Sequence, residues 1–455
     1  MDPSFVRSLL RPDLMQMLDD DDTAGLEAFV SELYPAVAAE VIDDLSTAQM
    51  VRVLREADPT AQAAIVGFLP LARQVELAEA LEPEQLAPVV AEMAPDDRVD
   101  LVDRLGNADA AAIMPLLPPA DRDDIRTLLS YPEGTAGAIM TSEFTSLPES
   151  LTAAEAIARL RAHSADRETI YYIYIIDAGG RLTGFLSLRG LISADPQTPL
   201  ADLVERDIIS ARVSDDAEEL ARDLLRYDFL ALPVVDERNR LVGIVTYDDA
   251  ADVAVEEAEE DAQRSAAVVP LDDGYLDTPL LTLVWKRGVW LVLLLGAAFL
   301  TAWVLSRYEP SGEGGWMVLF IPLVLASGGN AGSQSATLVI RTIALEDDEP
   351  RDPAGSLFGR IFRKETLVGL CLGVGLCVLS LLVAAVLLDS WAKCVTVAVT
   401  VLLVVLLGTF LGAVLPMSFR RSGLDPALMS TPLIAALVDV LGVIVYYEIA
   451  RLLVG

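Results

Sequence analysis

Five long apolar stretches fill the C-terminal part of this 455-residue chain. Each can span a bilayer, because a hydrocarbon core of about 30 Å needs about 20 helical residues. In lipid only helices and closed barrels satisfy the backbone, so runs of this length predict an α-helical transmembrane bundle with five spans. We place the spans at Gly288–Ser306, Trp316–Leu345, Thr366–Leu388, Cys394–Met417 and Pro426–Leu453.

The orientation follows from the basic residues between the spans. Lys and Arg collect before the first span, between the second and third, and between the fourth and fifth. They are scarce in the other two connections, and Arg451 is the one basic residue that disagrees. Because short basic flanks stay in the cytosol, we predict a multi-pass protein of the cell (inner) membrane with its N-terminal domains in the cytosol.

The part before the spans is strongly acidic. Basic and acidic residues are equal in number from residue 278 onward, so the net charge of −35 comes entirely from the residues before it. Such a surface repels nucleic acid and attracts cations, which excludes nucleic acid as a partner. A solubilising surface of the halophile type is the alternative explanation.

The second span combines small and polar residues at mid-membrane depth. Gly328, Gly329 and Gly332 predict a broken helix, whose freed backbone groups must line a cavity or be buried in protein. The freed carbonyls, with Asn330 and Gln334, would be oxygen ligands for a hard cation or its water shell. Close helix packing through small residues is the alternative.

The fifth span contains Asp439 within an apolar run. An ionised carboxylate at mid-helix costs several kcal/mol unless it faces water or a cation, so Asp439 is a candidate for binding a transported ion. Pairing with Arg341, or protonation, is the structural alternative. The chain has no Walker lysine motif. A dication that enters down 100 mV gains about 4.6 kcal/mol, so uptake would need no other energy source.

Residues 1–130 predict stacked short helices. Pro83, Pro95 and Pro119 stand at multiples of a twelve-residue step, and Gly106-Asn107 fills the missing step. Proline starts a helix at its first turn, so the repeat predicts an all-α superhelical N-domain. We find no catalytic constellation in it.

Residues 131–255 contain a second, longer repeat. Arg181-Leu182 and Arg240-Leu241 lie 59 residues apart, within two copies of a strand, a polar turn, a glycine-led strand and a helix. This order resembles an α/β tandem pair of CBS domains. Such pairs often bind adenine nucleotides through a Ser or Thr and an Asp three residues later. Thr246 and Asp249 match that pattern, whereas the first copy has Gly190 in place of the Asp. ATP is therefore a possible ligand.

An acidic segment follows and leads to the first span. Asp249, Asp252, Glu256 and Glu260 lie on one face of the predicted helix. A row of like charges destabilises a helix unless cations bridge it to something else, and Mg²⁺ suits such a site because it accepts one or two carboxylates. A solvated linker helix is the alternative.

The whole order of parts resembles the MgtE family of magnesium channels and transporters. Two membrane motifs, residues 322–341 and 425–442, carry the resemblance together with the helical N-domain and the CBS pair. The family's architecture implies a homodimer with the pore between two five-helix bundles. The acidic helix would be its plug. Asp439 would recognise hydrated Mg²⁺, and Asn330, with Gly328 and Gly329, would line the pore.

The resemblance also implies regulation by cytosolic Mg²⁺. Carboxylates at the boundary of the N-domain, the CBS pair and the plug would repel one another and open the pore when Mg²⁺ is scarce. Bound Mg²⁺ would bridge them and close it. The matching positions are Asp96, Asp100, Glu218, Asp228, Asp249, Asp252, Glu257, Glu260 and Asp261.

We therefore predict a multidomain, non-enzymatic transporter with four parts. These are the N-domain (1–130), the CBS pair (131–255), an acidic connecting helix with its linker (256–277) and the pore domain (278–455). The sequence leaves two alternatives open, a transporter of another divalent ion such as Co²⁺ or Mn²⁺ and a nucleotide-sensing membrane receptor. An enzyme has no support, because the chain offers no Ser/His/Asp set and no paired His ligands.

Overall fold

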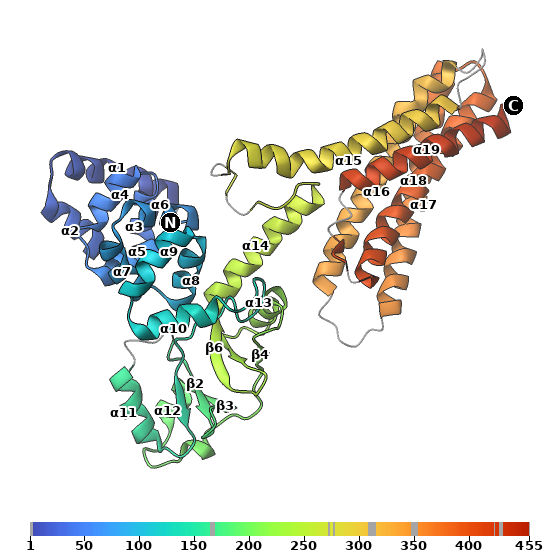
Figure 1. Ribbon diagram of the computed structural model, residues 1–455. Helices are drawn as coiled ribbons and strands as arrows, with labels where there is room; N and C mark the ends of the chain where they lie inside the picture. The colour runs from blue at the N-terminus through green and yellow to red at the C-terminus, as the bar shows by residue number, and fades with distance from the viewer. Residues whose placement is uncertain are drawn as a thin grey trace. The chain divides into compact units, whose positions relative to one another are not determined.

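The computed structural model forms two compact units, residues 1–257 and residues 258–455 (Figure 1). We describe each unit by itself. The structure describes residues 3–163, 169–271, 274–275, 278–307, 315–346, 354–422, 424–426 and 431–454.

The first unit begins with a stack of short helices (Figure 1). Odd-numbered helices pack on odd-numbered neighbours, and even-numbered on even-numbered, which produces two layers that wind together. This confirms the predicted superhelical N-domain. Its helices are α1 (Pro3–Asp19), α2 (Thr23–Glu32), α3 (Pro35–Ile42), α4 (Thr47–Leu54), α5 (Pro59–Val66), α6 (Leu71–Ala80), α7 (Pro83–Glu92), α8 (Pro95–Arg104), α9 (Asn107–Ile113) and α10 (Pro119–Leu128).

Local sequence determines where these helices begin. Pro83, Pro95 and Pro119 each occupy the first turn, where a missing N–H costs nothing because that group has no partner within the helix. Asp58 caps α5 by accepting a hydrogen bond from the Ala61 backbone N–H at 2.8 Å. The apolar side chains of the two layers then share one core.

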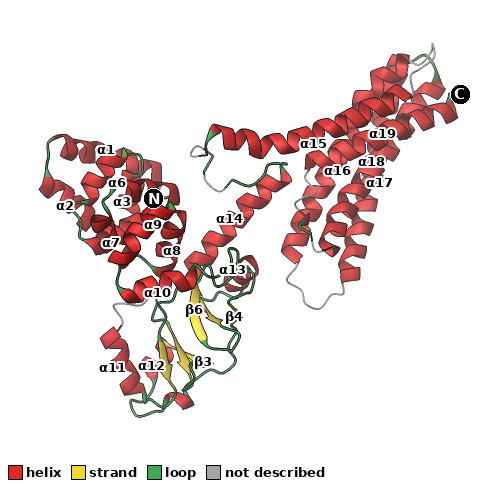
Figure 2. Ribbon diagram, viewed as in Figure 1, coloured by secondary structure: helices red, strands yellow, loops and turns green. Residues whose placement is uncertain are grey.

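Two small three-stranded sheets follow, one in each copy of the 59-residue repeat (Figure 2). In both, the first strand is parallel to the second and the second antiparallel to the third, with an irregularity at the same place in the middle strand. The elements are β1 (Ser146–Pro148), α11 (Ala153–His163), β2 (Tyr172–Ile176), β3 (Leu182–Ser187), α12 (Leu188–Ser193), β4 (Ala211–Arg212), α13 (Ala217–Arg226), β5 (Ala231–Val235) and β6 (Leu241–Thr246).

The two halves bind each other through equivalent turns. The Leu182 N–H donates to the Asn239 carbonyl at 3.0 Å, and the Leu241 N–H donates to the Gly180 carbonyl at 3.1 Å. These reciprocal bonds, made by positions 59 residues apart, give the pair a local twofold arrangement. The predicted CBS-like repeat is therefore present in the fold.

The acidic helix α14 (Tyr247–Ser265) begins in the first unit and ends in the second. The second unit continues with helices long and apolar enough to cross a membrane, five in the described residues. α16 packs on α18 and α19, α17 on α18, and α15 on α19 (Figure 1). They are α15 (Leu280–Arg307), α16 (Gly315–Glu346), α17 (Ala354–Leu387), α18 (Trp391–Arg421) and α19 (Thr431–Leu453).

The five predicted spans are thus present, and three of them start at clearly different residues. α15 begins at Leu280, before the predicted Gly288, and α17 begins at Ala354, before the predicted Thr366. α19 begins at Thr431 rather than at Pro426. Residues 427–430 of the predicted fifth span lie outside the described residues. Large apolar side chains such as Leu281 and Val386 remain exposed, as expected of a surface that faces lipid.

Candidate ion-binding sites

Carboxylates of α8 and α14 gather within the first unit. Asp96 and Asp97 stand in the first turn of α8, where the helix dipole favours negative charge. Burial raises the pKa of Asp97 to about 6, and repulsion from Asp249, Asp252 and Asp248 adds to the effect. The α14 carboxylates therefore act directly on the first turn of α8.

Asp100 stands one turn further along α8. Burial raises its pKa to about 7, followed by repulsion from Asp97, Glu256, Asp103 and Asp249. By surface area Asp100 is nevertheless exposed, so water screens part of both effects.

Asp249 connects the two helices. Burial raises its pKa, whereas hydrogen bonds from Thr246 and from the Asp96 side chain lower it. A hydrogen bond between two carboxyl groups requires a shared proton, which a bridging cation could replace. Burial and the charge of Asp248 also raise the pKa of Asp252.

The remaining predicted regulatory residues lie elsewhere. Glu218 on α13 forms an ion pair with Arg222, and Asp228 is exposed in a left-handed turn after that helix. Neither is among the charges that raise the pKa of Asp97 or Asp100. Glu257 and Asp261 are half-buried along α14.

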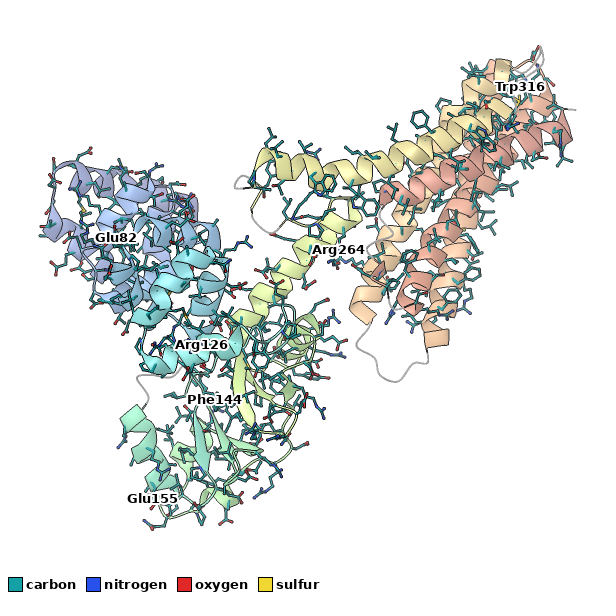
Figure 3. All side chains as sticks on the ribbon, viewed as in Figure 1. Glu82, Arg126, Phe144, Glu155, Arg264 and Trp316 are labelled. Carbon is teal, nitrogen blue, oxygen red and sulfur yellow. The ribbon has the colours of Figure 1, made fainter. Side chains whose placement is uncertain are left out.

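Within the second unit, Glu260 pairs with Arg264, which also lies 3.1 Å from an Asp425 carboxylate oxygen. Figure 3 shows Arg264 near the end of α14. The end of the acidic helix is thus attached to the connection between α18 and α19.

The predicted nucleotide pair is present and engaged internally. The Thr246 hydroxyl lies 2.5 Å from carboxylate oxygens of both Asp248 and Asp249. In the first copy the Ser187 hydroxyl accepts a hydrogen bond from the Gly190 N–H at 3.1 Å and caps α12. Only the second copy therefore presents a hydroxyl and a carboxylate together at these positions.

The predicted break in the second span is wrong. α16 is one helix from Gly315 to Glu346, so the backbone carbonyls at Gly328, Gly329 and Gly332 belong to an intact helix. The glycines serve close packing instead, which was the alternative. A Cβ on Gly328 would meet a Val404 methyl at 2.2 Å, and one on Gly408 would meet the Gly328 carbonyl oxygen at 2.4 Å.

Asp439 lies beside this small-residue face. A Cβ on Gly329 would be 3.7 Å from Asp439 Oδ1, so the structure brings these two predicted pore residues together. Asp439 is half-buried, and within the described residues no ion pair joins it to Arg341. Asn330 and Gln334 are exposed on α16, on the outside of the described bundle.

Sequence reasoning missed one member of the carboxylate group of α8 and α14. Asp97 was overlooked beside Asp96, although its spacing of three from Asp100 signals a shared helix face. The described residues contain no group of three or more His, Cys, Asp or Glu side chains placed to hold a metal ion.

A helical repeat and a CBS pair are followed by an acidic helix and by five apolar helices long enough to cross a membrane, one of which carries Asp439. These parts together are those of a membrane transporter for cations. The chain belongs to the MgtE family. The family profile described as a divalent cation transporter matches residues 321–449, the MgtE intracellular N domain matches 33–134, and CBS domains match 136–196 and 200–256.

Individual relatives agree with this membership. The chain is 42% identical over 331 residues to the magnesium transporter MgtE of Thermus thermophilus, covering 72% of each chain. It is 36% identical to that of Enterococcus faecalis over 72% of this chain and 71% of the relative. The crystal structure of the cytosolic domain of the Mg²⁺ channel MgtE in complex with ATP is 37% identical, with a TM-score of 0.52, over 54% of this chain and all of that one. These relatives are named as transporters, in agreement with the expectation that the chain is not an enzyme.

Proposed function

We propose that this chain carries Mg²⁺ into the cell down the membrane potential, along a path lined by α16 and α19. The observation that carries the proposal is the Asp439 carboxylate beside Gly329, within the stretch of α19 from Pro432 to Val445, whose other residues are apolar or small. The relatives' names support Mg²⁺ as the ion. Entry of a dication down 100 mV releases about 4.6 kcal/mol, which suffices without ATP.

The path requires a second copy of the chain. Asn330 and Gln334 are exposed on a helix that lies in the membrane, where lipid cannot satisfy their amides. A homodimer that places α16 and α19 of both copies around one aqueous pore would hydrate these amides and Asp439 together. The membrane would be the inner membrane, with residues 1–257 in the cytosol.

Cytosolic Mg²⁺ would close this path by binding between α8 and α14. Asp97 and Asp100 have raised pKa values because burial and the α14 carboxylates disfavour their charged forms. Mg²⁺ needs only one or two carboxylates and keeps several waters, so pairs such as Asp96 with Asp249 fit it even without a group of three acids. Bound Mg²⁺ would hold α14 against α8, and its loss would release α14.

The other carboxylates that the family resemblance implies would also bind regulatory Mg²⁺. Glu257, Glu260 and Asp261 would do so toward the C-terminal end of α14. Glu218 and Asp228 would do so on the second CBS copy. ATP would bind the second CBS copy through Thr246 and Asp249. Support for a nucleotide as ligand comes from a relative whose cytosolic domain is in complex with ATP.

The test is Mg²⁺ flux in proteoliposomes while Mg²⁺ on the side of the soluble unit is varied. Wild-type flux should fall as that Mg²⁺ rises. A double variant, Asp97→Asn with Asp100→Asn, should need a higher concentration for the same inhibition. The matched control is Asp123→Asn, an exposed α10 carboxylate paired with Arg126. Flux that ignores Mg²⁺ on the soluble side would contradict the regulatory part, whereas no flux at all would contradict transport.

A further inference from the structure

Three basic side chains form a row near the start of α17. Arg360, Arg363 and Lys364 are all exposed, and their spacing of three and four residues places them on one side of the helix. Among the described residues, no acidic side chain forms an ion pair with Arg363 or Lys364. Because like charges at this spacing repel one another, a negative group from outside the chain would stabilise the row.

The opposite side of α17 packs within the bundle. Glu365 accepts a hydrogen bond from the Ser335 hydroxyl of α16 at 2.7 Å. Further along, a Cβ on Gly373 would lie 2.8 Å from a Leu402 methyl of α18. These contacts fix the rotation of α17 about its axis, so the basic row faces away from α16 and α18.

An apolar stripe continues the basic row along the same side of α17. It consists of Leu367, Val374 and Val378, which are all exposed although they lie in a membrane-spanning helix. The helix rises about 16 Å from the first of these residues to the last, which is about half of a 30 Å hydrocarbon core. The stripe therefore has the length of one leaflet of the bilayer.

We propose that this side of α17 binds an anionic phospholipid. The phosphate would receive charge-assisted hydrogen bonds from the basic row, and one acyl chain would lie along the apolar stripe. The order of depth is that of a lipid, because side chains of a helix lean toward its N-terminus and the basic groups therefore extend outward from the stripe. In the proposed orientation this end of α17 meets the cytosolic leaflet.

Other ligands match this side of α17 less well. A zwitterionic headgroup would bring its ammonium toward three basic groups, and the neighbouring acid, Glu365, is bonded to Ser335 on the opposite side of the helix. A soluble phosphate compound would gain nothing from the apolar stripe. The ligand should therefore combine a net negative headgroup with acyl chains, as phosphatidylglycerol does.

The test measures binding of dioleoyl phosphatidylglycerol and dioleoyl phosphatidylcholine to the full chain by native mass spectrometry. The wild type should prefer phosphatidylglycerol. The double variant Arg363→Gln with Lys364→Gln should lose about tenfold in affinity for phosphatidylglycerol and keep its affinity for phosphatidylcholine. Arg363→Lys with Lys364→Arg, which retains both charges, should bind like the wild type and shows that changes at these two positions are tolerated.

Arg421→Gln is the matched control for a general attraction of positive charge. Arg421 is an exposed basic residue at the same end of the bundle, but its guanidinium lies 4.4 Å from the centre of the Phe358 ring, on the side of α17 that faces α18. This variant should keep the preference for phosphatidylglycerol.

Four results would overturn the proposal. The first two are equal binding of both lipids by the wild type and an unchanged preference in the double glutamine variant. The third is a loss in Arg421→Gln as large as that in the double glutamine variant. The fourth is displacement of the bound lipid by an equal concentration of glycerol 3-phosphate, which has the phosphate without the acyl chains.

Discussion

Replacing Asp97 by Asn should stabilise residues 1–257 when Mg²⁺ is absent. The Asp97 carboxylate lies close to Gly67, where an added Cβ would be 2.9 Å from its Oδ2, and it faces the charges of Asp249, Asp252 and Asp248. The amide has nearly the same shape as the carboxylate but carries no charge. The substitution therefore removes repulsion without creating a cavity.

The size of the effect follows from the pKa of Asp97. Its rise from 3.8 to about 6 corresponds to about 3 kcal/mol as an upper value. Because the folded-state pKa is the higher one, the folded protein holds an extra proton between pH 4 and pH 6. Stability therefore falls as pH rises through this range, and the full cost is present above pH 6. Asp100, with a pKa of about 7, acts in the same direction up to about pH 7, but its exposure reduces its share.

Pulse proteolysis of the full chain in EDTA, from pH 4 to pH 8, measures this effect as the stability of the soluble unit. The wild type should lose stability as pH rises from 4 to about 7, and Asp97→Asn should lose less, with the difference between the two arising between pH 4 and pH 6. Asp123→Asn, with a well-exposed side chain, is the control and should behave like the wild type. Saturating Mg²⁺ should stabilise the wild type more than Asp97→Asn. Identical pH profiles for the wild type and Asp97→Asn would refute the electrostatic argument.

Three further predictions test other parts of the structure. Gly408→Ala should lower the thermal stability of the membrane unit strongly, because its Cβ would lie 2.4 Å from the Gly328 carbonyl oxygen, whereas Gly296→Ala, with open space around it, should have little effect. Arg98→Met should cost about 3 kcal/mol or more in chemical unfolding, since this buried side chain donates to three backbone carbonyls; a loss below 1 kcal/mol would argue against that role. Thr246→Val should weaken ATP binding about tenfold in calorimetry, and unchanged affinity would exclude its hydroxyl from the nucleotide site.

The sequence predicts the local elements of this fold well. The N-domain helices can be predicted because a proline at the first turn and an apolar face are both visible in neighbouring residues. The two sheets can be predicted because the 59-residue repeat contains the same strands twice. The membrane spans follow from length and apolar composition. Their starts differ where the helix continues beyond the apolar stretch, as at Ala354.

Features that depend on distant partners could not be predicted in the same way. Whether Gly328 breaks α16 or packs it depends on Val404 and Gly408, which lie about 80 residues away in the chain. That Asp97 meets the charges of Asp249 and Asp252 depends on how α8 faces α14. Glu365 on α17 accepts a hydrogen bond from Ser335 on α16, and no local sequence pattern predicts such a contact between two helices.

Mg²⁺ flux through Asp439→Asn, compared with the wild type in proteoliposomes, is the most direct test of the proposed path. The amide keeps the shape of the side chain beside Gly329 and removes its charge, and Glu448→Gln on the same helix is the control. We predict that Asp439→Asn abolishes Mg²⁺ flux while Glu448→Gln retains it, with both proteins folded. Mg²⁺ flux at the wild-type rate in Asp439→Asn would contradict the account.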